Sequence, residues 1–250
     1  ARNPGFAFRQ QLDRIVNLWD NLRLVNTSLP LHVLHSGTVR RLPAQLELLQ
    51  REGVALHAMP NPWVPAWSSG SHYSSFAKLH VFNASWSLRC KLIYLDTDLL
   101  ILRNIDHLAS VPTPAVVFRG DVELLNTGVQ VVHVRSQEQL DFFWRTAAAR
   151  FNHRGEYHPR CMVRHGLGWQ APWGVDADSH GSDQEILADY ALRNREGLFE
   201  LPATYNAYPW QMNHSTAWCM DVHVLHKVTR LEQKGLTPEC VRFIRARQRH

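Results

Sequence analysis

Two aspartates separated by a single residue stand in the most apolar stretch of this 250-residue chain. Asp96 and Asp98 interrupt a run from Lys91 to Leu102 in which most other residues are aliphatic or aromatic. Such density is typical of a strand buried on both faces, where an unpaired carboxylate is strongly unfavourable. A divalent cation would stabilise both carboxylates, and a turn at the strand end can bring their oxygens to one ion. The pattern favours a cation site for an anionic substrate, most simply a diphosphate.

Two other interpretations of the Asp-x-Asp pattern stay open at this point. The ordinary one is a strand end whose aspartates cap a turn. A haloacid-dehalogenase-type phosphatase also carries an apolar Asp-x-Asp, but it requires Thr or Val two residues after the second Asp. Leu100 occupies that position here, and no later Gly-Asp-x-x-x-Asp follows. The phosphatase is therefore the less favoured of the two.

The elements that must position these residues alternate along the chain. Apolar spacing predicts helices over residues 8–22, 42–51, 73–86, 137–151 and 182–193, and a last helix that begins at Thr237-Pro. Strands are predicted over residues 31–35, 54–59, 91–102, 114–119, 128–134 and 221–225. Ser182 and Glu185 have the spacing of a helix capping box. Alternating helices and strands predict an α/β fold.

Composition is that of one ordinary globular domain. The chain is 45% hydrophobic and 20% charged, enough for a substantial core, although two small lobes are not excluded. The net charge of +5 suits anionic partners, and the Arg-rich residues 242–250 are predicted to be a solvated helix end. The remaining charges are too mixed for a nucleic-acid-binding face. No run approaches the length of a membrane span.

Cysteines and sequons say less about chemistry. The cysteines lack the close spacing of a zinc site, so packed thiols or a single disulfide are expected for Cys90, Cys161, Cys219 and Cys240. Three tripeptides have the N-glycosylation pattern, beginning at Asn26, Asn83 and Asn213.

Residues 152–180 are rich in His, Gly, Trp and Pro without a clear period, and they are predicted to form a long acceptor or active-site loop.

Six short motifs occur in one order along the chain: Phe76-Ala-Lys-Leu79, Tyr94-Leu-Asp-Thr-Asp98, Leu102-Arg-Asn-Ile-Asp106, Leu125-Asn-Thr-Gly-Val129, Gly181-Ser-Asp-Gln-Glu185 and Val224-Leu-His226. Together they resemble glycosyltransferase family 8, which includes glycogenin and the plant xylan glucuronosyltransferases. The resemblance covers roughly residues 10–230. It implies a GT-A (Rossmann-like) fold with a mostly parallel central sheet flanked by helices. It also implies a retaining transferase that uses manganese (or magnesium) and a nucleoside-diphosphate sugar, expected to be UDP-linked.

The same resemblance assigns metal ligands. Asp96 and Asp98 match the two carboxylate ligands, and His226 matches the third ligand from the protein. Two carboxylates, one imidazole and two diphosphate oxygens suit a six-coordinate divalent ion. The ordinary alternative for His226 is a hydrogen-bonded histidine at a strand end, and His223 beside the same strand is the competing candidate.

Residues expected around the donor sugar also follow from the resemblance. Lys78 matches a lysine that contacts the donor, and Asn126 matches a residue that hydrogen-bonds the sugar. Asp183 and Gln184 match a pair that lies against the transferred sugar, so Lys78, Asp183 and Gln184 are the candidate catalytic residues. The ordinary alternatives are a solvated helix lysine, a turn Asn before Gly128, and an acidic residue in the first turn of a helix.

Two departures from the family pattern shape the domain prediction. Family members open with a strand that helps to hold the nucleoside, whereas this sequence begins at about the following helix. The expectation is a single GT-A domain over residues 1–250 that lacks this first nucleotide-binding strand. The family's Gly-x-x-Lys-Pro-Trp after the metal histidine is also absent, so Lys227 or Arg230 is expected to bind the phosphates.

The resemblance and the sequons also give expectations for the partners and the compartment. The acceptor is expected to be a glycan or glycoprotein, and a non-catalytic sugar-nucleotide or glycan-binding module is the alternative function. Sequons, a first residue other than Met and the glucuronosyltransferase relatives favour a Golgi lumenal domain with a membrane anchor outside this chain. Cytosolic glycogenin makes the cytoplasm the alternative. The oligomeric state is not readable from the sequence.

Overall fold

The computed structural model describes residues 4–36, 44–60, 73–118, 125–152, 183–193, 198–208, 221–227 and 238–247. The chain divides into two compact units that are interleaved in sequence. The first unit contains Ala1–Ala58, Leu95–Leu108 and Pro202–His250, and the second contains Met59–Tyr94 and Ala109–Leu201. The expected loop at 152–180 lies outside the described residues beyond Asn152. That residues 1–250 form a single domain without a first strand stays a prediction.

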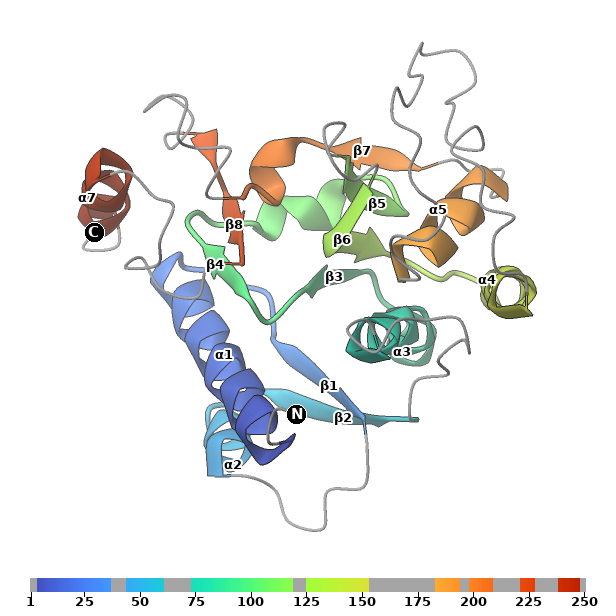
Figure 1. Ribbon diagram of the computed structural model, residues 1–250, viewed down its shortest axis with the longest axis horizontal. Helices are drawn as coiled ribbons and strands as arrows, with labels where there is room; N and C mark the ends of the chain where they lie inside the picture. Colours follow the sequence, from blue (N-terminus) through green and yellow to red (C-terminus); the bar gives the residue numbers. More distant parts are fainter. Residues whose placement is uncertain are drawn as a thin grey trace. The chain divides into compact units, whose positions relative to one another are not determined.

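The first unit begins with two helices and a two-stranded sheet (Figure 1). Helix α1 (Pro4–Leu24) is followed by β1 (His32–Ser36), α2 (Ala44–Arg51) and β2 (Ala55–Met59). Buried Leu12 of α1 packs with Val33 of β1 and with Leu46 and Leu49 of α2. Leu12 belongs to the apolar face of α1 that the helical spacing predicted, because i, i+3 and i+4 residues share one side of a helix. The two helices and two strands predicted between residues 8 and 59 are therefore confirmed.

A second pair of strands completes the described sheet structure of the first unit. β4 (Leu99–Ile101) and β8 (Val224–His226) are antiparallel, with Leu99 opposite His226 and Ile101 opposite Val224. All residues of both strands are buried. Short 3₁₀ turns flank them, η2 (Asp106–Ser110) and η4 (Ala203–Tyr205), and α7 (Pro238–Arg247) is the last helix. Arg242 and Arg245 of α7 are exposed, as expected for a solvated helix end.

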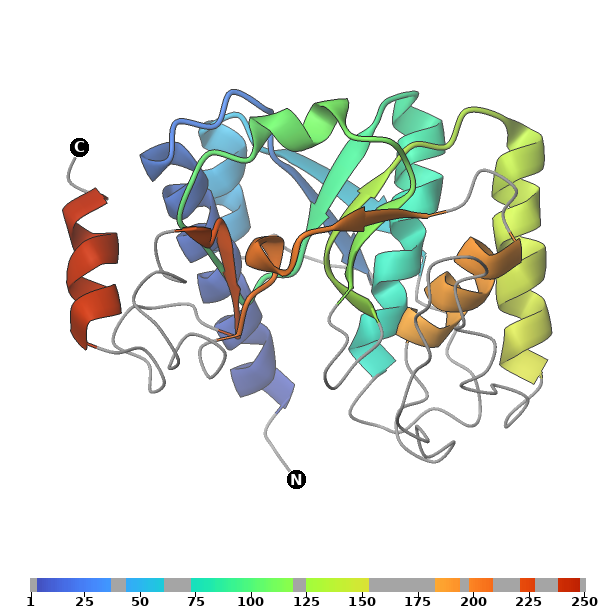
Figure 2. The same ribbon diagram turned by 90° about the horizontal axis from the view of Figure 1, so that it is seen from above.

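The second unit contains a four-stranded sheet in the order β3-β6-β5-β7 (Figures 1 and 2). Its elements are η1 (Tyr73–Leu79), α3 (His80–Leu88), β3 (Leu92–Leu95), β5 (Ala115–Phe118), β6 (Leu125–Val132), α4 (Gln137–Asn152), α5 (Asp183–Arg193) and β7 (Phe199–Leu201). β5 is antiparallel to β6 and parallel to β7, so this sheet combines both strand directions. Of these elements, the short strand β7 had no counterpart in the sequence prediction.

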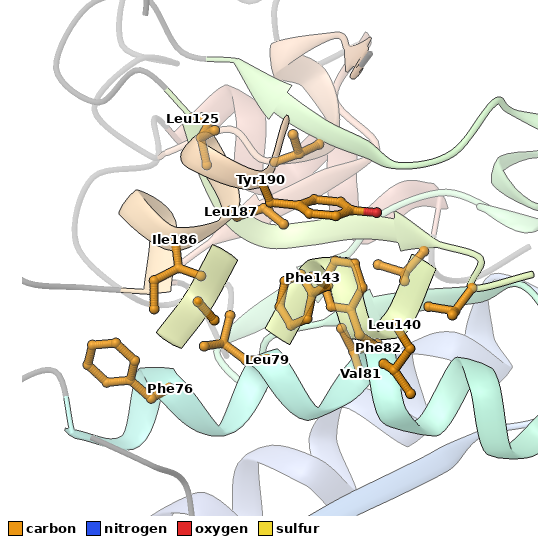
Figure 3. Close-up of a cluster of buried hydrophobic side chains, with 14 residues drawn as sticks. Phe76, Leu79, Val81, Phe82, Leu125, Leu140, Phe143, Ile186, Leu187 and Tyr190 are labelled. Carbon is orange, nitrogen blue, oxygen red and sulfur yellow. The ribbon is translucent and has the colours of Figure 1, made fainter. Parts of the chain in front are cut away.

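The core of the second unit is formed by helices α3, α4 and α5 packed against the sheet (Figure 3). Phe143 of α4 is fully buried and stacks on Phe82 of α3 with ring centroids 3.7 Å apart. Tyr190 of α5 contacts both rings edge-on, at 5.4 and 5.2 Å. Edge-on aromatic contacts such as those of Tyr190 add to the stabilisation from buried area. This core holds the first turn of α5 and strand β6, which carry candidate site residues.

The structure differs from the sequence prediction at the Asp-x-Asp stretch. The predicted single strand over 91–102 is two strands, β3 and β4, separated by the turn that contains Asp96 and Asp98. β3 is only half-buried, whereas β4 is buried throughout. Two carboxylates within one strand would each lie between apolar layers, so a turn that exposes them partly is favoured. The predicted helix over 73–86 likewise begins as the 3₁₀ turn η1 before α3.

The described cysteines show both predicted states. Cys90 is a free thiol, and burial raises its pKa. Cys240 of α7 is buried and disulfide-bonded. The predicted capping residue Ser182 lies outside the described residues, and α5 begins at Asp183. Within the described part of the chain, no helix combines the length and apolar character needed to cross a membrane.

Candidate functional site

The turn between β3 and β4 presents two carboxylates. Leu95 ends β3 and Leu99 begins β4, so Asp96-Thr97-Asp98 forms the whole connection. The Thr97 hydroxyl donates a hydrogen bond to Oε1 of Gln11 at 2.7 Å. Gln11 belongs to α1, so a helix far away in sequence fixes the middle of the turn. The side chains of Asp96 and Asp98 are 14% and 25% exposed, which leaves both partly accessible to a ligand.

Strand pairing brings His226 to the same place. The antiparallel register sets His226 opposite Leu99, the residue after Asp98. The His226 amide donates to the carbonyl of Ala207 at 2.8 Å, and the ring stacks on Tyr208 with centroids 4.8 Å apart and an interplanar angle of 23°. Both rings are almost fully buried. The backbone and the stacked ring together restrict the orientation of the imidazole.

The three side chains converge around a common point. Nε2 of His226 lies 3.5 Å from Oδ1 of Asp98 and 3.9 Å from Oδ2 of Asp96. One potential ligand atom from each residue lies within 4.8 Å of the others. Neighbouring ligands of an octahedral cation are about 3 Å apart and opposite ones about 4–5 Å, given metal–oxygen distances of about 2.0–2.6 Å. The spacing and the donor types therefore suit one divalent ion, although the ligand roles themselves stay predictions.

The competing histidine does not join this group. His223 immediately precedes β8, and its Nδ1 pairs with the carbonyl of Asp221 at 3.0 Å. Its ring stacks on Tyr205 at 4.5 Å. Burial, and after it the positive charge of Arg103, lowers the pKa of His223 and favours a neutral ring. Of the two histidines, His226 is the one that faces the aspartates.

The residues expected to bind phosphate lie after His226. Lys227 has a left-handed backbone, with φ at 59°, and an exposed side chain. Its Nζ lies 5.1 Å from the centroid of the Tyr208 ring, which is within the range of a cation–π contact. Tyr208 therefore contacts both His226 and Lys227. Arg230 lies outside the described residues, and the phosphate role of either cation stays a prediction.

In the second unit, a lysine, a threonine and an aspartate form a buried polar chain. Lys78 Nζ donates to Thr127 Oγ1 at 3.2 Å, and the Thr127 hydroxyl donates to Asp183 Oδ2 at 2.6 Å. The lysine nitrogen lies 3.8 Å from the same carboxylate oxygen. Lys78 is 15% exposed and Asp183 only 2%. Lys78 is thus not a solvated helix lysine, because its charge is directed at a buried carboxylate.

Asp183 also benefits from its position at the first residue of α5, where the helix dipole favours a negative charge. The ordinary interpretation of this acid and the functional one are therefore compatible. Gln184, the next residue, is half-buried. The donor-sugar roles of Lys78, Asp183 and Gln184 stay predictions.

Asn126 lies at the edge of an irregularity in β6. Val116 pairs with Gln130, but the next residue of β5, Val117, pairs with Asn126, so residues 127–129 form a bulge. The Asn126 side chain is buried, and its Oδ1 accepts a hydrogen bond from the amide of Gly128 at 2.9 Å. Bulges re-aim side chains and often occur beside functional sites. The hydrogen bond from Gly128 supports the role of Asn126 in a local turn. A contact between Asn126 and the donor sugar stays a prediction.

Three residues of these groups were not singled out from the sequence: Thr127, Tyr208 and Gln11. Thr127 lies inside the motif that begins at Leu125, and its position one residue from Asn126 was the available signal. Tyr208 stacks on His226, and Gln11 of α1 accepts a hydrogen bond from Thr97, which lies between the two aspartates. No local pattern marks them, because both contacts depend on tertiary packing.

Comparison with known proteins gives a fold but no family assignment. No family model and no curated protein matches the sequence. Among solved structures, the chain is similar to mouse xyloside xylosyltransferase 1 in its apo form, with a TM-score of 0.50 and 15% sequence identity. The alignment covers 86% of this chain and 92% of that chain. This likeness confirms the predicted α/β fold class, with a central sheet flanked by helices.

Proposed function

We propose that this protein is a metal-dependent glycosyltransferase. It transfers a sugar from a nucleoside-diphosphate sugar, expected to be UDP-linked, to a glycan or glycoprotein acceptor and retains the anomeric configuration. The observation that carries the proposal is the convergence of Asp96, Asp98 and His226 on one point. The likeness in fold to an enzyme named a xyloside xylosyltransferase supports the same reaction class.

The donor set favours a manganese or magnesium ion. Carboxylate oxygens are hard ligands that both ions accept, and an imidazole nitrogen favours the transition metal of the two. When bound, such an ion would supply Lewis-acid stabilisation of the departing diphosphate. Asp96, Asp98 and His226 would hold it. Tyr208 and Gln11 would keep these ligands in place, through the stacked ring and through the bond to Thr97.

Lys227 or Arg230 is proposed to bind the phosphates beside the ion. Lys227 directly follows the proposed metal ligand His226, and its exposed side chain places Nζ 5.1 Å from the centroid of the Tyr208 ring, a cation–π contact. Exchange of that contact for a phosphate oxygen is electrostatically favourable.

On the sugar side, Lys78, Asn126, Asp183 and Gln184 are proposed to bind and orient the transferred residue. Asp183 is buried and accepts a hydrogen bond from Thr127 beside the Lys78 charge, all of which makes its carboxylate a poor nucleophile. Gln184 carries an amide, which is also a poor nucleophile. These two facts favour attack of the acceptor hydroxyl from the face that the diphosphate leaves. The acceptor proton would then pass to the departing phosphate oxygen.

A lumenal compartment, with a membrane anchor outside this chain, is part of the proposal. The disulfide of Cys240 supports an oxidising environment, since cytosolic proteins seldom keep structural disulfides. A cytoplasmic location is the alternative. Imaging of the tagged protein together with a Golgi marker, and alkylation of its cysteines before reduction, would distinguish them.

The test is a donor screen with product analysis. UDP-glucose, UDP-glucuronate, UDP-galactose and UDP-xylose are supplied with Mn²⁺, and UDP release is measured with and without a chelator. We expect release with at least one donor, its loss on chelation, and its loss in Asp98→Asn. Asp20→Asn is the matched control, because this exposed carboxylate lies on α1 of the same unit.

The outcome of the screen also separates the alternatives. Release of inorganic phosphate in place of UDP would indicate a phosphatase. Mn²⁺-dependent binding of UDP-sugars without turnover, across a panel of glycan acceptors, would indicate a binding module. Anomeric analysis of the product by NMR tests retention, and an inverted product would refute the front-face route.

A further inference from the structure

Two of the three sequons lie in the described part of the chain, and they differ in environment. One begins at Asn26, two residues after the end of α1, and the other begins at Asn83 inside α3. A glycosylated asparagine is compatible with the folded state only if its side chain can extend into solvent there. The two sites can therefore be distinguished by the contacts of their carboxamides.

Asn83 uses its side chain inside the second unit. Its Oδ1 accepts a hydrogen bond from Nε1 of Trp144 at 2.8 Å, and its Nδ2 pairs with Nδ1 of His80 at 3.1 Å. The side chain is part-buried between α3 and α4. A glycan on Nδ2 would replace the contact with His80 and would have to fit against Trp144. Chains modified at Asn83 should therefore not reach this fold.

Asn26 has the opposite character. It is exposed and has a left-handed backbone, with φ at 55°. Its amide donates to Arg23 O at 3.0 Å, and the next amide, of Thr27, donates to Leu22 O at 3.1 Å. This pair of bonds is a Schellman motif that ends α1, and Asn is tolerated at its left-handed position. The backbone of Asn26 thus closes the helix while its side chain lies at the surface.

The rest of this sequon is held tightly in the folded state. The Ser28 hydroxyl and amide both donate to Oδ2 of Asp106, at 2.7 and 2.8 Å, and the Thr27 hydroxyl donates to the same carboxylate. Asn104 Nδ2 donates to the Asn26 carbonyl at 2.8 Å. The hydroxyl that defines the sequon is therefore engaged, and the backbone is bent into a helix cap. An enzyme that reads an extended Asn-x-Ser could not engage this turn.

We propose that Asn26 is an N-glycosylation site that is modified before the end of α1 folds, and that Asn83 stays unmodified in the folded protein. In this step, Asn26 Nδ2 loses one hydrogen as a proton and forms a bond to the anomeric carbon of a lipid-linked oligosaccharide. The bond from that carbon to the lipid diphosphate breaks, and the diphosphate leaves with the electron pair. The inference rests on the lumenal part of the proposed function, but not on the transferase chemistry.

The first experiment measures which asparagines carry glycan. The whole chain is translated behind a secretory signal in the presence of microsomes, and the product is digested with a glycosidase that converts modified Asn to Asp. Peptide mass spectrometry should find the conversion at Asn26, and Asn26→Gln should lose the mass of one glycan. In protein secreted from cells, Asn83 should be unconverted. An unconverted Asn26, or a converted Asn83 in the secreted protein, would overturn the proposal.

The second experiment tests the order of modification and folding. Unmodified chain, purified in folded form, is incubated with solubilised oligosaccharyltransferase before and after unfolding in urea and dilution. We expect modification of Asn26 only in the unfolded sample. Equal modification of both samples would refute the required order. Because glycan mass and UDP release are separate measurements, a glycosylated but inactive protein would count against the proposed transferase alone.

Discussion

Asp106 gives the sharpest stability prediction, because its carboxylate holds the turn that follows α1. The side chain accepts hydrogen bonds from the hydroxyls of Thr27 and Ser28, from the Ser28 amide and, at 3.4 Å, from Asn104. Burial raises the pKa of Asp106, but these hydrogen bonds outweigh it and lower the pKa from 3.8 to about 2. The ionised form is thus the one that the folded state prefers.

The size of the effect follows from this difference in pKa. Each pKa unit corresponds to about 1.4 kcal/mol, so the full difference would be worth about 2.4 kcal/mol. Because solvent reaches part of this carboxylate, screening reduces the expected contribution to about 1–2 kcal/mol. A lowered pKa contributes fully above the unfolded value of 3.8 and is lost as the pH falls toward about 2. About half of the contribution should remain at pH 3.

Urea unfolding of the wild type and of Asp106→Asn between pH 7 and pH 3 measures this contribution. The variant should be less stable by about 1–2 kcal/mol at pH 7, and the difference should shrink by about half at pH 3. Asp20→Asn, on the exposed face of α1, should follow the wild type throughout. A difference that stays constant with pH, or that grows as the pH falls, would refute the role assigned to Asp106.

Three further predictions concern the other packed groups. Tyr208→Leu removes the ring that stacks on His226, so Mn²⁺ affinity in a direct titration should fall roughly tenfold; unchanged affinity would show that the ring does not position the ligand. Lys78→Met leaves the buried Asp183 without its cation and should lower the free energy of unfolding by about 3 kcal/mol. Adding Asp183→Asn should recover at least about 1 kcal/mol in a double-mutant cycle, and simple additivity would contradict the pairing. Phe143→Ala removes a fully buried ring and should cost about 3–5 kcal/mol in urea unfolding, where a loss below about 1 kcal/mol would contradict the packing.

The spacing of apolar residues was sufficient to predict those helices and strands whose buried residues recur periodically. Helix α1 shows this best, because Leu12 and its i+3 and i+4 neighbours form one apolar face against β1 and α2. The same approach missed the break between β3 and β4. Apolar density alone does not distinguish one strand from two, and the two aspartates that interrupt it also mark the turn. The partly exposed turn that replaces the predicted single strand still brings both carboxylates close to His226.

The third member of the candidate metal group, His226, could not be derived from local pattern. His226 ends β8 and His223 immediately precedes it, and hydropathy gives no reason to prefer either histidine. The choice is made by the register with β4, which sets His226 opposite Leu99, and by the stacking on Tyr208. Register is a long-range property that depends on pairing partners distant in sequence. Motif resemblance pointed to His226, the histidine that the structure places beside the aspartates, because a motif match carries such long-range information.

Motif resemblance does not by itself say what a matched residue does. The motif that ends at Asp106 matched as well as the others, and its carboxylate is occupied by the turn after α1. Asp183 is matched as a residue beside the sugar, yet it is buried next to Lys78 and closes a structural chain through Thr127. A carboxylate that is already neutralised can orient a substrate through its neighbours but is poorly suited to attack a carbon. A retaining reaction on this scaffold would therefore depend on the departing phosphate rather than on a protein nucleophile.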